Sequence, residues 1–425
     1  MDADRESLLT PTDRGLFSSS NKSIGLGNSP RWRRNVLVIV ISLLLAICLT
    51  VYFYLNMEVI DGIQDAPDRF KPLSRRKPIL DHESIFSGSG PSMIRLSDLL
   101  AHCIVALRVA GQEIVDLSLV HNDKLKQVGS KGKTLEGVDD VVTGADLKSH
   151  HIILRTIKDS YRRLTVVSEE DSTQNFDSIS ADNDILPMDR TKFAKLIRNN
   201  LHEIENKNTD WGSLIAQHET LVWIDPLDAT KEYSENLTNY VTLMACIVHK
   251  SIPIAGVIYQ PFSNRSYWSM KNVNTGEYHH SPDLSRALAE AQFEQSSNGI
   301  RIIVSRSHAG NVKSVVEGLY GERAHVISAG GSGYKTLKLI QGEADAYMHL
   351  TRIKKWDICA PDAILSSIPG GNLTDLAGKS INFGNPKDQV VDSGLVASLN
   401  RKVFSELLVL TRNFKGSGEK PGTEV

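Results

Sequence analysis

The longest unbroken run of apolar residues lies near the N-terminus, at residues 36–55. It contains no charged residue and shows no polar face. A helix rises about 1.5 Å per residue, so this run is long enough to cross the hydrocarbon core of a bilayer. A cleaved signal peptide would be shorter and would end at small residues. We therefore predict one transmembrane helix at 36–55.

Charges on the two sides of this run predict its orientation. Basic residues ending at Arg34 precede it, and acidic residues beginning at Glu58 follow it. By the positive-inside rule, residues 1–35 face the cytosol, and the rest of the chain lies in the secretory lumen or outside the cell. The sequence thus predicts a single-pass type II membrane protein.

The segments next to the span predict no folded domain. In the cytosolic tail, the pattern Asp-Arg-Glu-Ser-Leu-Leu at residues 4–9, from Asp4 to Leu9, resembles acidic dileucine signals that sorting adaptors bind, with an inert tail as the alternative. Residues 56–92 mix Pro, Gly, Ser and basic residues, and we interpret them as a stalk. This leaves residues 93–415 for one lumenal domain and 416–425 for a flexible tail.

Two further features concern the lumenal part. Three Asn-x-Ser/Thr triplets are compatible with N-glycosylation there; they begin at Asn236, Asn264 and Asn372. Three cysteines also lie beyond the span, at Cys103, Cys246 and Cys359. Each stands among apolar residues, so we expect buried free thiols in preference to a disulfide. So few cysteines also exclude a disulfide scaffold.

The apolar pattern of the lumenal part changes from helical spacing to short strand-like runs. Helical spacing predicts helices at 94–110 and 141–161. Short apolar runs then predict strands at 164–167, 221–224, 240–248, 252–259, 302–304 and 325–327. Further helices are predicted at 311–319, 334–340 and 401–411. This order predicts an α/β (α+β) fold of alternating α and β layers.

A long insertion separates two of the predicted strands, at residues 171–220. Its first half, up to residue 189, is acidic and polar, and we expect a mobile loop there. The second half contains a helical pattern at 190–205.

The composition is that of a folded protein. The chain has a net charge of −2, with 41% hydrophobic and 23% charged residues. These values exclude a fibrous or wholly disordered chain. They also argue against a nucleic-acid binder that relies on bulk positive charge.

Acidic residues gather where predicted strands end. Glu169 and Glu170 follow the strand at 164–167, and the strand at 221–224 leads directly into Asp-Pro-Leu-Asp-Ala-Thr at 225–230. Farther along the chain, Asp357 follows a tryptophan. Carboxylates at strand ends are candidates for one shared site.

The segment 225–230 has the chemistry of a metal site beside an anion cradle. A proline turn brings Asp225 and Asp228 to one side, where they repel each other unless a cation lies between them. Their oxygens and the Leu227 carbonyl are hard ligands of the kind that Mg²⁺ prefers. The amide of Thr230, at the start of a predicted helix, would face an anion. We therefore predict a Mg²⁺ site next to a phosphate.

With Asp146 added, these segments resemble the signature of the inositol monophosphatase superfamily of Mg²⁺-dependent, lithium-sensitive phosphatases. The likeness extends over about residues 94–415 and implies the sugar-phosphatase fold of that superfamily. By this resemblance, Glu169, Asp225 and the Leu227 carbonyl would hold one Mg²⁺. A second would be held by Asp225, Asp228 and Asp357, and a third, weakly held ion near Glu169 is allowed.

The same resemblance implies the catalytic roles. Thr230, hydrogen-bonded to Asp146, would orient and deprotonate the attacking water, so no covalent intermediate is expected. Glu170 is not carried over as a ligand and is interpreted as an acid behind the ligands or on the surface.

Four segments carry a closer likeness to the Golgi branch that removes the 3′-phosphate from 3′-phosphoadenosine 5′-phosphate; they are residues 223–230, 304–308, 329–335 and 353–360. A glycine-rich turn at 330–333 predicts a second anion site at the start of a helix. By resemblance, the substrate contacts are Ala229, Thr230, Ser305, His308, Gly331, Lys335 and Asp357.

The implied reaction yields AMP and phosphate in the Golgi lumen, where it would support sulfation. A bisphosphate nucleotide suits two anion pockets better than an inositol monophosphate does. An inositol phosphate phosphatase of the same fold is the alternative, and a membrane-tethered inactive scaffold is a third hypothesis. The sequence is also compatible with a homodimer.

Overall fold

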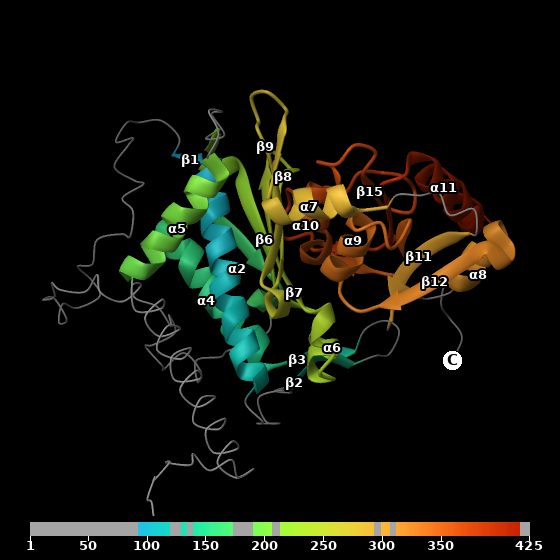
Figure 1. The fold of residues 1–425 in the computed structure, drawn as a ribbon, viewed down its shortest axis with the longest axis horizontal. Helices are drawn as coiled ribbons and strands as arrows, with labels where there is room; N and C mark the ends of the chain where they lie inside the picture. Colours follow the sequence, from blue (N-terminus) through green and yellow to red (C-terminus); the bar gives the residue numbers. More distant parts are fainter. Residues whose placement is uncertain are drawn as a thin grey trace, which may run out of the picture. The chain divides into compact units, whose positions relative to one another are not determined.

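The computed structural model describes residues 92–119, 129–133, 139–172, 190–205, 213–292, 299–306 and 312–416 (Figure 1). The predicted span at 36–55, the tail with its dileucine pattern and residues 56–91 of the stalk lie outside these residues, as do residues 173–189 of the loop predicted at 171–189. Within the described ranges, no helix combines the length and the apolar character that a membrane crossing requires.

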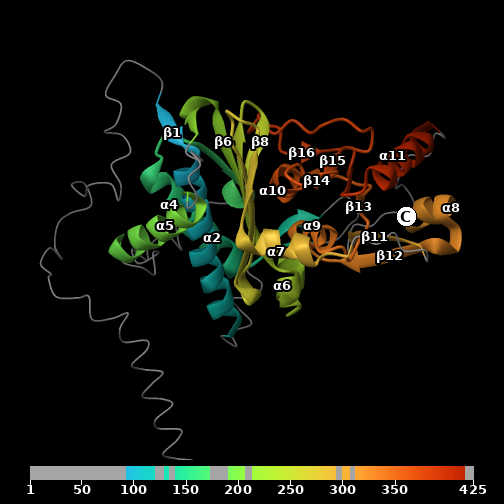
Figure 2. The same cartoon turned by 45° about the horizontal axis from the view of Figure 1, so that its top comes forward.

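One face of the first sheet is covered by a layer of N-terminal helices (Figures 1 and 2). The helix α2 (Leu96–Leu119) is buried along most of its length and packs against α4 (Gly144–Ser160) and α5 (Arg190–Glu205). The short strand β1 (Met93–Arg95) precedes α2 and pairs with β5 (Leu214–Ala216). The predicted helices at 94–110 and 141–161 are therefore confirmed, and the one at 190–205 has the predicted bounds.

The first sheet has the strand order β10-β9-β8-β7-β6-β4. Its strands are β4 (Thr165–Ser168), β6 (Thr220–Asp228), β7 (Thr242–His249), β8 (Ile252–Gln260), β9 (Arg265–Lys271) and β10 (Tyr278–His280). The strands β4 and β6 run parallel, and the other neighbours are antiparallel. Every residue of β6 is buried, because helices cover both faces of the sheet.

A second sheet follows, with the order β12-β11-β13-β17-β15. Its strands are β11 (Ile300–Ser305), β12 (Ala324–Ala329), β13 (Ala346–His349), β15 (Asn372–Thr374) and β17 (Leu395–Ser398). The helices α7 (Pro282–Glu290), α9 (Ser332–Ile340) and α10 (Lys355–Leu365) form a layer between the sheets (Figure 1). The helices α8 (Val312–Tyr320) and α11 (Arg401–Gly416) lie beyond the second sheet.

The observed order is therefore helix, sheet, helix, sheet, helix, which confirms the expectation of alternating α and β layers. Two small antiparallel pairs complete the described elements, β2 (Gly129–Lys133) with β3 (Asp139–Val142) and β14 (Ile353–Lys354) with β16 (Val390–Val391). The predicted strand at 240–248 begins only at Thr242, because residues 238–240 form a 3-10 turn.

The expectation of free thiols is wrong for two of the three cysteines. Cys246 in β7 and Cys359 in α10 form a disulfide, with 5.7 Å between their Cα atoms. They are 113 residues apart, and only the packing of α10 on the first sheet brings them together. Cys103 in α2 is free and buried, as expected.

Candidate active site

Three chain segments bring acidic side chains to one end of the first sheet. Ser168 at the end of β4 lies opposite Ile224 in the parallel strand β6, so Glu169, directly after β4, and Asp225, within β6, come next on neighbouring strands. Asp228 ends β6, and Asp357 lies in the first turn of α10, which packs on β6, β7 and β8.

The charges of these carboxylates act on one another. Burial and the negative charges of Glu169 and Asp228 raise the pKa of Asp357 well above its ordinary value. Burial also raises the pKa of Asp228, against the opposing effects of Lys335 and of hydrogen bonds. Side chains from three segments therefore share one electrostatic environment, in which the positive charge of Lys354 offsets the repulsion at Asp357 only in part.

These residues fit Mg²⁺ by donor chemistry. In the part of the chain that the structure describes, no three acidic, histidine or cysteine side chains are already close enough together to hold a metal ion. The candidate donors are nevertheless carboxylates and a backbone carbonyl, which are hard oxygen ligands. A cation would also relieve the repulsion that acts on Asp357.

Asp228 is held in place by two neighbouring elements. Its Oδ2 accepts hydrogen bonds from the Thr242 hydroxyl and the Gly333 amide, both at 2.8 Å, and its Oδ1 accepts one from the Ser332 amide at 3.0 Å. A carboxylate has about four lone-pair directions, so one stays available on Oδ1 for a metal ion. These bonds fix the end of β6 against α9.

Two amides of the glycine-rich turn at 330–333, those of Ser332 and Gly333, bind the protein's own Asp228 carboxylate. These two amides are therefore not offered to a substrate anion, and a second anion site at this helix start stays a prediction. Gly331 has a φ of 65°, and a Cβ there would lie 2.9 Å from Asp228 Oδ2. Only glycine adopts this conformation readily, so this position lets the turn approach the carboxylate closely.

Thr230 and Asp146 form a hydrogen-bonded pair. The Thr230 hydroxyl lies 2.7 Å from Asp146 Oδ1 and 3.0 Å from the Leu227 carbonyl oxygen, both of which can accept its proton. Asp146 is fully buried, and its Oδ2 accepts hydrogen bonds from the amide of Thr143, at 2.8 Å, and from the Thr143 hydroxyl. These contacts form a capping box at the start of α4 and fix the carboxylate that faces Thr230.

The turn that carries these groups has its own supports. Ala229 adopts a left-handed conformation, with a φ of 72°, and precedes the short helix α6 (Thr230–Ser234). The Ser149 hydroxyl of α4 donates to the Pro226 carbonyl at 2.6 Å, a contact that no sequence pattern predicts. The turn is therefore anchored to the same helix that positions Asp146.

Cationic residues lie beside the carboxylates. Lys335 is buried, and burial lowers its pKa, although Asp228, Glu232 and Asp357 partly offset this effect. Its Nζ lies 5.1 Å from the centre of the Tyr347 ring. Lys335 thus lies among the candidate metal ligands.

Arg306 is a feature that sequence reasoning missed. Its guanidinium pairs with Glu232 at 3.3 Å and with Glu235 at 3.1 Å, and so joins the end of β11 to α6. Its amide donates to the Ala329 carbonyl at 3.1 Å. The motif residues Ser305 and His308 stand out in the sequence, but nothing in the sequence places α6 beside β11.

Three further positions singled out in the sequence are Ser305, His308 and Glu170. Ser305 ends β11 opposite Ala329. His308 lies outside the described residues. Glu170 is 5% exposed, so of its two interpretations the surface acid is wrong.

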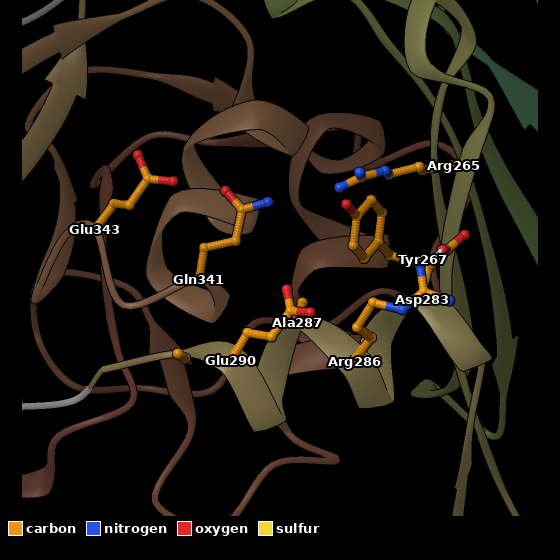
Figure 3. Close-up of a pocket in the computed structure, with 9 residues that line it drawn as sticks. Arg265, Tyr267, Asp283, Arg286, Ala287, Glu290, Gln341 and Glu343 are labelled. Carbon is orange, nitrogen blue, oxygen red and sulfur yellow. Dashed lines mark ion pairs between the residues drawn. The ribbon is translucent and has the colours of Figure 1, made fainter.

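A cavity of about 250 Å³ lies elsewhere, between β9, α7 and the turn after α9 (Figure 3). Its lining residues include Arg265, Arg286, Glu290 and Glu343, but none of the residues described above. Figure 3 shows acidic and basic side chains around it together. This cavity is therefore separate from the carboxylate group.

Known proteins match this chain in sequence and in structure. The inositol monophosphatase family profile matches residues 97–415. The chain is 35% identical over 311 residues to "Putative inositol monophosphatase 3" of Drosophila melanogaster, covering 73% of this chain and 80% of the relative. It is 35% identical over 312 residues to "Golgi-resident adenosine 3',5'-bisphosphate 3'-phosphatase" of Bos taurus, covering 72% and 77%. The crystal structure of CysQ from Bacteroides thetaiotaomicron matches with a TM-score of 0.47 at 20% identity, covering 71% and 97%.

Proposed function

This chain belongs to the inositol monophosphatase family and is a phosphatase, and we propose that it removes the 3′-phosphate from adenosine 3′,5′-bisphosphate in a Mg²⁺-dependent reaction. The products are AMP and inorganic phosphate. The observation that carries the catalytic assignment is the Thr230–Asp146 hydrogen bond at 2.7 Å, beside the turn that bears Asp225 and Asp228.

Water is the nucleophile in the proposed reaction. The Thr230 Oγ1 accepts a proton from the attacking water as its own proton passes to Asp146 Oδ1, along the observed hydrogen bond. Asp146 is suited to this role because the Thr143 contacts keep it oriented. The phosphorus–oxygen bond to the 3′-oxygen breaks as the bond to water forms, and the leaving 3′-oxygen takes up a proton from solvent water to give the 3′-hydroxyl of AMP.

The metal-binding roles are proposed for the same residues that the sequence indicated. Glu169, Asp225 and the Leu227 carbonyl would hold one Mg²⁺, and Asp225, Asp228 and Asp357 a second. When bound, Mg²⁺ supplies Lewis acidity, which lowers the pKa of water and offsets charge on the phosphoryl group. The raised pKa of Asp357 supports this assignment, because burial and the like charges of Glu169 and Asp228 both disfavour its ionised form in the absence of a cation.

The choice of substrate rests on relatives and on local charge. One relative is named as an adenosine 3',5'-bisphosphate 3'-phosphatase and another as a putative inositol monophosphatase. Both are 35% identical to this chain in sequence. The cations Lys335 and Arg306 near the carboxylates favour the substrate with more negative charge. Ala229, Ser305, His308 and Gly331 are proposed as further substrate contacts.

The location of the enzyme is a proposal as well. We infer a Golgi membrane protein with its catalytic domain in the lumen, anchored by residues 36–55. A relative named as Golgi-resident supports this location. The Cys246–Cys359 disulfide also supports it, because disulfides persist in the oxidising secretory pathway.

A substrate comparison with the full-length protein tests the proposal. We expect higher kcat/KM for adenosine 3′,5′-bisphosphate than for myo-inositol 1-phosphate, and no phosphate release after Mg²⁺ is chelated. Asp225→Asn should be nearly inactive, whereas Asp392→Asn, whose side chain is 72% exposed, should keep normal activity. Turnover retained by Asp225→Asn would refute the metal assignment, and a preference for the inositol phosphate would change the substrate.

A further inference from the structure

The helix α10 packs unusually closely on three adjacent strands of the first sheet. Trp223 in β6 lies opposite Cys246 in β7, which lies opposite Gly256 in β8. Above this row, the Trp356 ring lies 6.5 Å from the Trp223 ring. A Cβ at Gly256 would lie 2.7 Å from the Ala360 carbonyl oxygen, so glycine is needed for the helix to approach.

The disulfide lies within this contact and joins two segments that carry or support candidate metal ligands. Cys359 is two residues after Asp357 on α10. Cys246 is four residues after Thr242, the residue whose hydroxyl donates to Asp228. The bond therefore joins the element that carries Asp357 to the strand that holds Asp228 in place. Both cysteines are almost fully buried, at 1% exposure or less.

The position of Asp357 depends on how the start of α10 is held against the sheet. Two non-covalent contacts hold it near this end, the packing of Trp356 on Trp223 and the ion pair of Lys355 with Asp388 at 2.8 Å. The disulfide adds a covalent link between the same helix and the sheet.

We propose that the Cys246–Cys359 disulfide is a positioning clamp that keeps Asp357 in place for Mg²⁺ binding, so that the enzyme binds Mg²⁺ more tightly in its oxidised form. This inference rests on the proposed function, since Asp357 acts as a ligand only if the site holds Mg²⁺. Because non-covalent contacts also hold α10, loss of the disulfide weakens metal binding without abolishing it.

The redox step is ordinary thiol–disulfide exchange. The two cysteine thiols lose two protons and two electrons as their S–S bond forms. A disulfide of an oxidoreductase or of a small thiol takes them up, and its own S–S bond breaks to give two thiols. Both cysteine sulfurs are buried, so the exchange requires α10 to separate locally from β7. A chain that folds in a reducing compartment would lack the clamp.

Three full-length proteins test the clamp: the wild type, the double variant Cys246→Ala/Cys359→Ala, and the control Cys103→Ala. The control removes the same sulfur atom from a fully buried site in α2 but breaks no bond. Burial raises the pKa of Cys103 to about 12, so this thiol is unreactive in all proteins that retain it. Mg²⁺ affinity is measured without substrate, from the rise in Tm with Mg²⁺ concentration, and again from phosphate release.

We expect the double variant to bind Mg²⁺ roughly tenfold more weakly, the size of effect typical of groups that position metal ligands. Its kcat at saturating Mg²⁺ should stay close to that of the wild type, and Cys103→Ala should bind Mg²⁺ normally. Wild type reduced with dithiothreitol should match the double variant, which dithiothreitol should not change. The reduced wild type also provides the comparison if the double variant does not fold.

Two results would overturn the clamp. One is equal Mg²⁺ affinity in the oxidised wild type and the reduced wild type or double variant. The other is the finding that alkylation labels both Cys246 and Cys359 as free thiols in protein purified from secretory membranes without reductant. Failure of the proposed function looks different, because the wild type itself would then show neither phosphate release nor stabilisation by Mg²⁺.

Discussion

The Thr230 hydroxyl donates to Asp146 Oδ1 at 2.7 Å, although 84 residues separate the two. Asp146 lies in the first turn of α4 and Thr230 follows β6, and the Ser149 contact to Pro226 ties the same two elements together. The pair therefore does not depend on a flexible side chain finding its partner. The folded scaffold orients the carboxylate before any substrate arrives, which is what a proton acceptor requires.

Substitutions at Thr230 separate its chemical role from its packing role. Thr230→Ala removes the hydroxyl that relays a proton to Asp146, and we expect kcat to fall by about 10²- to 10⁴-fold. Thr230→Ser keeps the hydroxyl and should retain most of the activity. Steady-state kinetics at saturating Mg²⁺ measure both. Equal losses in the two variants would show that the methyl group, and not the proton relay, is what the site needs.

Gly331→Ala tests the close approach of the glycine-rich turn to Asp228. The new Cβ would meet Asp228 Oδ2 at 2.9 Å and would require a φ of 65° that L residues adopt reluctantly. We expect kcat/KM to fall by about tenfold or more, or about 1.4 kcal/mol of transition-state stabilisation. The matched control is Gly318→Ala in α8, where nothing lies within 4 Å. The control should keep full activity and gain about 0.5–1 kcal/mol of stability.

Asp362 in α10 predicts a pH dependence of stability. Burial raises the pKa of this carboxyl from 3.8 to about 7, against a hydrogen bond from Ser366. Between these values the folded protein binds a proton that the unfolded chain has released, so the free energy of unfolding falls as pH rises. Asp362→Asn lacks this titration. At pH 8 we expect Asp362→Asn to be about 2 kcal/mol more stable than the wild type. This is less than the full pKa shift would give, because the Asp362 side chain is partly exposed to solvent. At pH 4 the two proteins should differ little in stability.

Urea denaturation at pH 4 and pH 8 measures this difference, with the exposed Asp392→Asn as the control. A wild type that keeps the same stability relative to Asp362→Asn at both pH values would contradict the assignment.

The proposed topology is tested by protease added to sealed microsomes. If residues 1–35 face the cytosol, the protease should shorten the chain only by this tail. Detergent should then allow digestion of the remaining loops. Cleavage within residues 93–415 before detergent is added would place the catalytic domain on the opposite side.

Much of the fold was predictable because it depends on local patterns. The helix α5 shows a clear helical period, and the buried strand β6 is an apolar run that ends in a recognisable turn. The Thr230–Asp146 hydrogen bond followed from the family resemblance and is confirmed by the structure.

Other features depend on tertiary packing that no local pattern records. The disulfide of Cys246 with Cys359 exists because α10 crosses the first sheet at Gly256. The bonds from the Ser332 and Gly333 amides of the glycine-rich turn to Asp228 likewise join parts of the chain that lie far apart in the sequence. The pairing of Arg306 with Glu232 likewise requires β11 to lie beside α6.

The central claim is that Glu169, Asp225, Asp228 and Asp357 gather divalent cations for phosphate hydrolysis. The most direct measurement is a crystal structure of the protein soaked in Mn²⁺, a substitute for Mg²⁺ whose anomalous scattering locates it without ambiguity. We expect anomalous peaks within about 2.0–2.3 Å of these carboxylate oxygens and of the Leu227 carbonyl oxygen. A structure in which Mn²⁺ binds elsewhere, or in which these four carboxylates stay too far apart to share a cation, would contradict the claim.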